Sequence, residues 1–168
     1  MTDLVVADAG VRQLHARYVD AVWRKDIGAF GDCFAEDCEW RISGLSHRGR
    51  ADISKFMAAG FLKFRRILLT FRTPVLEVGE GVASGRVYMS EQSVLASGEG
   101  MTAIGTYYER FVQQGDRWRF SWRLFHTNYI GPPDLSAPFF DNPEYGAPPT
   151  MPPLDAPSFD RSGILTKK

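Results

Sequence analysis

Four long β-like segments, separated by short glycine turns, dominate the middle and later part of the chain. They span residues 66–78, 82–96, 101–114 and 117–129. The peptides between them, Gly-Glu-Gly, Ser-Gly-Glu-Gly and Gly-Asp, are turn signals of the kind that join antiparallel neighbours. Three such connections in succession predict an antiparallel meander, and a sheet of this kind must bury one face against another layer.

The residues before this meander supply the other layer. Segment 11–26 has a helical period, 27–37 contains a second short helix, 38–44 alternates like a strand, and 50–64 returns to a helical pattern. The apolar face of the first helix carries Val11, Leu14, His15, Tyr18 and Val22 at steps of three and four residues. We therefore predict an α+β fold in which three helices cover one face of a curved antiparallel sheet.

Nine of the ten prolines follow residue 131, so the composition changes near that point. Proline fixes φ and removes a backbone donor, which excludes an inner strand or a helix there. We expect one domain over residues 1–130 and an extended proline-rich tail over 131–168. Aromatic residues such as Phe139 and Phe140 predict that the tail packs on the body or on a neighbouring subunit.

The charge balance argues against a nucleic-acid or membrane partner. Lys and Arg together number 20, as do Asp and Glu, so the molecule has no net field to attract a polyanion. Arginine and aromatic residues do interleave in segment 117–129. Strand alternation predicts Arg117, Arg119, Ser121 and Arg123 on one face and Trp118, Phe120 and Trp122 on the other, which separates cations from stacking rings. No apolar run approaches membrane-spanning length and the N-terminus lacks a signal-peptide pattern, so we expect a cytoplasmic protein.

Metal and cofactor sites are not indicated. Cys33 and Cys38 match neither a redox pair nor a zinc knuckle, and we expect two ordinary reduced thiols. The three histidines, His15, His47 and His126, are too dispersed for a metal site. Segment 79–85 imitates a dinucleotide fingerprint but leads into a strand, and a P-loop is not found, so we expect no cofactor.

Three stretches resemble a known superfamily. Residues 16–30 resemble the first helix of ketosteroid isomerases, residues 34–44 resemble the acidic turn and first strand that follow, and residues 105–123 resemble the last hairpin. The group is the SnoaL-like, nuclear-transport-factor-2-like superfamily, which includes ketosteroid isomerase, scytalone dehydratase and hexachlorocyclohexane dehydrochlorinase. The resemblance covers residues 10–130 and implies a cone of curved sheet with three helices around an apolar pocket, often as a dimer.

The resemblance also assigns roles to single residues. Tyr18 matches the tyrosine that ketosteroid isomerase directs at its developing enolate oxygen. Arg123 matches the arginine with which the dehydrochlorinase contacts its leaving group, and Trp40 matches that enzyme's pocket tryptophan. Each known base of the family is missing, because Trp23 and Thr70 stand at the aspartate and histidine positions of the dehydratase and dehydrochlorinase. Ile42 stands at the aspartate position of ketosteroid isomerase.

Two other residue types can carry proton transfer or charge. His15, one turn before Tyr18, and His126, expected at the pocket rim, have side chains suited to moving protons at neutral pH. A guanidinium such as Arg123 on an inward strand face needs an anion, which is either a ligand oxygen or an ion-pair partner, Glu109 or Glu91. A two-residue hairpin loop places Tyr108 opposite Arg123 and a three-residue loop places Tyr107 there; the resemblance favours Tyr107.

These observations predict a cofactor-independent lyase or isomerase for a small hydroxylated aromatic or polycyclic compound, such as a lignin-derived phenolic dimer. Water, halide or formaldehyde would each suit as the leaving group. The candidate catalytic residues are Tyr18, Arg123, His15 and His126, and the expected substrate-binding residues are Trp40, Ile42, Phe61, Thr70, Tyr88, Ser90, Tyr107 and Asn128. A homodimer or homotrimer is expected. The alternatives are a non-catalytic binding protein for an apolar small molecule and an auxiliary subunit like that of ring-hydroxylating dioxygenases.

Overall fold

The predicted first helix forms, and it begins earlier than its apolar pattern suggested. In the computed structural model, which describes residues 3–141, α1 spans Leu4–Arg24. The Asp3 side chain accepts a hydrogen bond from the Val5 backbone N–H at 2.9 Å and caps the helix. The buried face comprises Ala7, Val11, Leu14, His15, Tyr18, Ala21 and Val22, which confirms the predicted apolar face.

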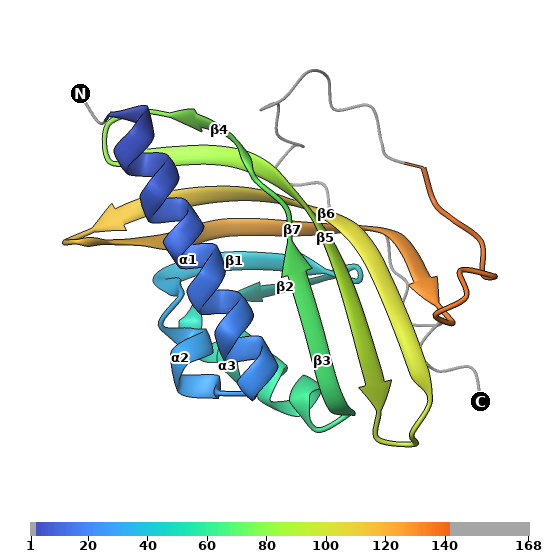
Figure 1. Cartoon of the computed structure of the whole chain (residues 1–168). Helices are drawn as coiled ribbons and strands as arrows, with labels where there is room; N and C mark the ends of the chain where they lie inside the picture. Colours follow the sequence, from blue (N-terminus) through green and yellow to red (C-terminus); the bar gives the residue numbers. More distant parts are fainter. Residues whose placement is uncertain (1–2, 142–168) are drawn as a thin grey trace.

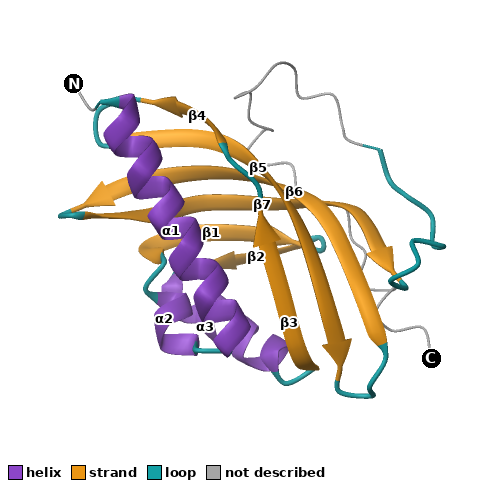
Figure 2. Cartoon of the chain, in the orientation of Figure 1, coloured by secondary structure: helices purple, strands orange, loops and turns teal. Residues whose placement is uncertain are grey.

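Two further helices and seven strands complete the described part of the chain (Figures 1 and 2). The short helix α2 (Ile27–Gly31) packs against both α1 and the helix α3 (Arg50–Phe61). The strands are β1 (Phe34–Ile42), β2 (Leu45–Arg48), β3 (Phe64–Phe71), β4 (Val75–Val78), β5 (Val82–Leu95), β6 (Gly100–Gln114) and β7 (Arg117–Gly131). The predicted segment 66–78 is two strands, because the chain leaves the sheet around Pro74, which has no N–H for a ladder.

All strands belong to one curved, unclosed sheet with the order β2-β1-β7-β6-β5-β3, and β4 also pairs with β5. The predicted antiparallel meander is present from β3 to β7. The expectation of a wholly antiparallel sheet was wrong, because β1 pairs with β7 in parallel and the sheet is therefore mixed. Turn signals indicate only how strands that follow each other in the chain are joined. They could not predict the pairing of β1 with β7, because these strands are far apart in the sequence.

A β-bulge in β7 changes which side chains face the helices. Arg110 pairs with Trp122 whereas Phe111 pairs with Phe120, so Ser121 is an extra residue in the ladder. The bulge shifts the alternation, and Phe120 lies on the concave face together with Arg123. The predicted separation of Arg123 from Trp118 and Phe120 was therefore wrong, and only Trp122 lies on the opposite face, in a small cluster with Tyr108 and Leu124.

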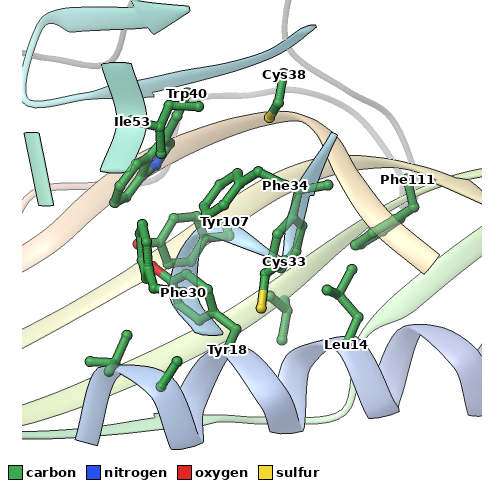
Figure 3. Packing of buried hydrophobic residues seen from close by; sticks show 14 of the residues in the cluster. Leu14, Tyr18, Phe30, Cys33, Phe34, Cys38, Trp40, Ile53, Tyr107 and Phe111 are labelled. Carbon is green, nitrogen blue, oxygen red and sulfur yellow. The ribbon is translucent and has the colours of Figure 1, made fainter. Parts of the chain in front are cut away.

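An aromatic core fills the space between the concave face and the helices. Its large members come from the helices and from the sheet and include Tyr18, Phe30, Phe34, Trp40, Tyr107 and Phe111 (Figure 3). Phe120 of β7 belongs to the same cluster. Helix α1 packs tightly on β7, because a Cβ placed on Gly10 would lie only 2.2 Å from the Trp118 ring. A side chain at that position would push the helix away from the sheet.

The segment after β7 returns along its outer side. The Phe139 ring packs against Tyr129 with centroids 4.7 Å apart, and the Phe140 N–H donates to the Asn128 carbonyl at 2.7 Å. Residues 132–141 thus pack on the body, and residues 142–168 of the predicted tail lie outside the described residues. Within the described range, no helix is long and apolar enough to cross a membrane.

Candidate active site

Arg123 forms the centre of the concave face, and its partner there is Glu109. The two residues pair across β6 and β7, and both are completely buried. The Glu109 Oε1 accepts from Nε of Arg123 at 2.8 Å and lies 2.7 Å from Nη2. Of the partners expected from the sequence, Glu109 is the one found. Neither tyrosine opposes Arg123, because the hairpin loop has two residues but the bulge at Ser121 moves the register by one.

Glu109 also holds His15. Its second oxygen, Oε2, lies 2.7 Å from Nε2 of His15, so one buried carboxylate joins α1 to the last two strands. Burial alone would raise the pKa of Glu109, but His15 and Arg123 outweigh this effect and leave the pKa below its ordinary value. The pKa of Arg123 is raised, because the nearby phenols and Glu109 outweigh the effect of burial. Arg123 and Glu109 therefore form a buried ion pair.

Aromatic rings surround the guanidinium of Arg123. Its Cζ lies 3.9 Å from the centroid of Tyr107, 4.1 Å from Phe120 and 4.4 Å from Tyr18. Distances in this range allow a favourable interaction of the cation with the ring faces, which strengthens when water is excluded. Tyr18, Tyr107 and Arg123 were predicted as site residues on separate grounds, and in the structure their side chains lie next to one another.

The two phenols are buried hydrogen-bond donors next to this cation. Burial raises the pKa of Tyr18 and raises that of Tyr107 still further, although Arg123 opposes the shift in both. Both hydroxyls therefore stay protonated at neutral pH. The phenol of Tyr18 interacts with Arg123 and with the hydroxyl of Tyr107, and Figure 3 shows the two tyrosines in one cluster. Yet within residues 3–141 no acceptor meets Nη1 of Arg123 with hydrogen-bond geometry.

Glu91 is a carboxylate of the concave face. From the sequence it was expected only as a possible ion-pair partner of Arg123. On β5 the residues that alternate with it, Val87 and Met89, belong to the core, so Glu91 points to the same side. Its carboxylate accepts a hydrogen bond from the Ser93 hydroxyl and lies near enough to raise the pKa of Tyr107. Burial raises the pKa of Glu91 itself. The sequence signal that could have identified Glu91 is its spacing, because it lies two and four residues from apolar positions of the same strand.

Several residues predicted to bind substrate lie on the opposite face of the sheet. Tyr88 and Ser90 alternate with Val87 and Met89 on β5, and Tyr88 is 40% exposed. Thr70, which pairs with Ser90, is exposed as well. The predictions for Tyr88 and Ser90 were wrong, because the alternation of β5 places the neighbouring odd-numbered residues inward. By the same alternation on β3, Thr70 does not face Arg123, and it lines a groove between α1 and β3 instead. Trp40, Ile42 and Phe61, by contrast, lie in or against the core cluster.

His126 and Asn128 also face away from Arg123. His126 lies within β7, two residues beyond Leu124 of the outer cluster, and its Nε2 donates to the Asp141 carbonyl at 3.0 Å. The Asn128 amide donates to the Phe140 carbonyl at 3.2 Å. The predicted catalytic role of His126 is therefore not compatible with a reaction at Arg123, because the sheet separates the two side chains.

Trp23 occupies the position at which the resemblance would place a catalytic aspartate. Its indole N–H donates to the Leu69 carbonyl of β3 at 2.8 Å, and half of the residue is exposed. The indole thus links α1 to the edge of the sheet. The two cysteines, both buried, have a pKa raised by desolvation to about 11 for Cys33 and about 12 for Cys38, which keeps them as thiols.

The lowered pKa of Glu109 predicts a specific sensitivity to acid. A carboxyl with a folded-state pKa below its unfolded value stabilises the fold above the ordinary glutamate range, and this contribution is lost as the pH falls through the lowered pKa. We expect Glu109→Gln to reduce the free energy of unfolding by about 3 kcal/mol at neutral pH. This difference from the parent should shrink on acidification, as urea denaturation at a series of pH values would measure. A difference that stays constant into acid would contradict the ion pair.

The comparisons with known proteins agree with this architecture. The sequence matches a family model described as a SnoaL-like domain over residues 5–123. No curated protein matches it significantly. A proposed scytalone dehydratase from Novosphingobium aromaticivorans superposes with a TM-score of 0.72 at 18% identity, covering 76% of this chain and 87% of that one.

Two other solved structures show the same likeness. A hexachlorocyclohexane dehydrochlorinase from Novosphingobium barchaimii has a TM-score of 0.67 at 16% identity, covering 83% of this chain and 97% of that chain. A nuclear transport factor 2-like protein from Salmonella enterica has a TM-score of 0.68 at 14% identity, covering 74% and 93%. At these identities the likeness shows a shared fold, and it confirms the predicted nuclear-transport-factor-2-like architecture.

Proposed function

Because the chain belongs to the SnoaL-like family, we propose that it is a cofactor-independent lyase or isomerase that acts on a small hydroxylated aromatic compound. One observation carries the proposal. A buried guanidinium, Arg123, and two buried phenols, Tyr18 and Tyr107, converge on the concave face. Donors arranged in this way suit an oxygen or halide that gains negative charge during a reaction.

The chemistry divides between charge stabilisation and proton removal. Tyr18 and Tyr107 stay protonated because burial raises the pKa of each, so both are able to donate to an oxyanion. Arg123 stays charged, and Glu109 holds it from one side so that the guanidinium keeps its position against the rings. Preorganised donors of this kind in a water-poor site need little rearrangement as charge develops.

Glu91 is the base that we propose for this reaction. A carboxylate with a pKa raised by burial accepts a proton more readily than an ordinary glutamate, and it faces the same side of the sheet as Tyr107. In an elimination, Glu91 takes a proton from carbon and that C–H electron pair forms the new double bond. The leaving group departs with its own electron pair, and the phenol and guanidinium groups stabilise the charge. In an isomerisation, Glu91 returns the proton to another carbon.

This assignment gives His15 a positioning role in place of the predicted acid–base role. Nε2 of His15 is held by Glu109, and the imidazole packs against Phe71 and Phe120, which also pack against Tyr18. His15 therefore acts through Glu109 on the orientation of Arg123. Two of the similar folds carry the names of a dehydratase and a dehydrochlorinase, and both names denote eliminations, which supports the reaction class.

The test begins with a search for the substrate. Hydroxylated aromatic compounds, including lignin-derived dimers and polyketide phenols, are incubated with the protein without added cofactor, and the products are followed by mass spectrometry. A product that differs by loss of water, halide or formaldehyde, or an isomer of equal mass, is the expected result. Recovery of every compound unchanged would contradict the enzymatic proposal.

With a substrate in hand, Glu91→Gln should lower turnover by about 10²- to 10⁴-fold, because general-base catalysis typically contributes that much. Turnover of the parent should rise with pH as Glu91 loses its proton, with a midpoint above the usual glutamate pKa because burial raises the pKa of this group. The matched control is Glu77→Gln, an exposed glutamate of β4 that should have no effect. If both variants turn over like the parent, Glu91 is not the base.

A second candidate function is supported by the ion pairing itself. Arg123 and His15 are both held by Glu109, and Trp23 stands where the family resemblance would place an acid. Groups that pair with one another favour a binding protein that holds an aromatic compound without converting it. The two functions are separated by the mass of the recovered compound, because a binding protein retains the ligand and returns it unchanged.

A further inference from the structure

A groove lies on the side of α1 that is turned toward the edge of the sheet. It has a volume of about 430 Å³ and is formed by one face of α1 and by β3 with the residues that follow it. The side chains that matter are Arg12, His15, Val19 and Trp23 from the helix and Phe71 and Arg72 from the strand and its end. Its size is that of a site for a small organic molecule.

The His15 imidazole gives the groove a polar group that is already oriented. His15 is only 5% exposed, and its Nε2 is fixed by Glu109 at 2.7 Å. Because a carboxylate oxygen can only accept, Nε2 carries the hydrogen in that contact. The remaining ring nitrogen, Nδ1, is buried and has no hydrogen-bond partner within residues 3–141. A ligand hydroxyl can satisfy Nδ1 in either protonation state of the ring.

The charge at the groove favours an anion. Arg12 and Arg72 line it and none of its lining residues is acidic. Arg12 is partly neutralised by Asp8, whose Oδ2 lies 2.6 Å from Nε of Arg12, which leaves Arg72 as the stronger attraction for a carboxylate. The walls are apolar and aromatic, and the Trp23 indole is held in place by its hydrogen bond to the Leu69 carbonyl. A flat ring fits between such walls.

We propose that this groove binds a small aromatic carboxylate that carries a hydroxyl group. The ring contacts Trp23 and Phe71, the carboxylate pairs with Arg72, and the hydroxyl bonds to Nδ1 of His15. The groove is distinct from the donors around Arg123, to which it is connected through the contact of His15 with Glu109 and through the Phe71 ring, which stacks on Tyr18. The proposal concerns binding and holds whether or not the protein is a catalyst.

The test uses 4-hydroxybenzoate as the probe, with affinity measured by isothermal titration on the full chain at constant salt. We expect binding of the parent, and an affinity at least about tenfold lower, equivalent to about 1.4 kcal/mol, for Arg72→Ala. Arg66→Ala is the matched control, because Arg66 is an exposed arginine of β3 that lies outside the groove, and its loss should leave the affinity unchanged. Benzoate, without the hydroxyl, and phenol, without the carboxylate, should each bind more weakly.

Two further variants locate the bound probe. Ala16→Phe places a ring into the groove from an exposed helix position and leaves the His15–Glu109 contact intact, so it should abolish binding. Tyr18→Phe alters the interior site and should leave the affinity unchanged. Absence of binding by the parent would overturn the proposal, as would equal losses from Arg72→Ala and Arg66→Ala. Binding that is weakened by Tyr18→Phe but not by Ala16→Phe would move the probe to the interior site and overturn it as well.

Discussion

Arg123→Met will destabilise the fold by about 3–5 kcal/mol, because it leaves the carboxylate of Glu109 buried beside a single remaining partner, His15. Methionine keeps most of the stem volume, so little of this loss is expected from packing. The free energy of unfolding is measured by urea denaturation at neutral pH. Arg117→Met, at an exposed position at the start of the same strand, is the control and should change stability by less than about 0.5 kcal/mol.

The double variant Arg123→Met/Glu109→Gln separates the ion pair from other effects of the arginine. Replacing the carboxylate by an amide removes the charge that the single variant leaves uncompensated, so the double variant should recover a large part of the lost stability. If the double variant instead loses as much stability as the two single variants together, Arg123 and Glu109 do not depend on each other.

Tyr18→Phe should fold like the parent and lose about two to three orders of magnitude in turnover, the typical cost of removing one donor to a developing oxyanion. The ring stays in the aromatic core, where it stacks on Phe71 with an interplanar angle of 7° and packs against Phe30. The variant removes only the hydroxyl next to Arg123 and Tyr107. Steady-state kinetics and a substrate-analogue titration are the measurements, and binding should change by less than about tenfold.

The control for Tyr18→Phe is Tyr88→Phe, because Tyr88 is a half-exposed tyrosine on the opposite face of the sheet. It removes the same atom at a site remote from Arg123 and should leave turnover unchanged. If Tyr18→Phe also turns over like the parent, the phenol has no part in the reaction, and the binding-protein function becomes the better description of this chain.

Much of the fold follows from local patterns. The three- and four-residue spacing from Val11 to Val22 sufficed to predict the buried face of α1, because a helix repeats its own geometry without help from other elements. The glycine turns predicted the order of β5, β6 and β7 for the same reason, since a tight turn leaves the next strand no other neighbour. The resemblance to the SnoaL-like family was confirmed by the family match.

Predictions that depended on strand alternation were less secure. Alternation is a local rule that one extra residue reverses, and the bulge at Ser121 brought Phe120 to the side of Arg123. Tyr88 and Ser90 were assigned to the pocket although their neighbours Val87 and Met89 face inward. Which alternate residues of a strand face the core depends on the partner strands and helices that cover it. A strand with apolar and polar residues on both faces does not reveal this from its sequence.

The sequence by itself determined the α+β class, the helix face that carries His15 and Tyr18, and the need of an inward Arg123 for an anion. Only the tertiary structure decided that Glu109 is that anion and that the same carboxylate holds His15, 94 positions away in the chain. It also decided that β1 lies parallel to β7. The physical reason is that helical period and turn chemistry act within a few residues, whereas a buried charge cluster forms where elements from distant parts of the chain exclude water together.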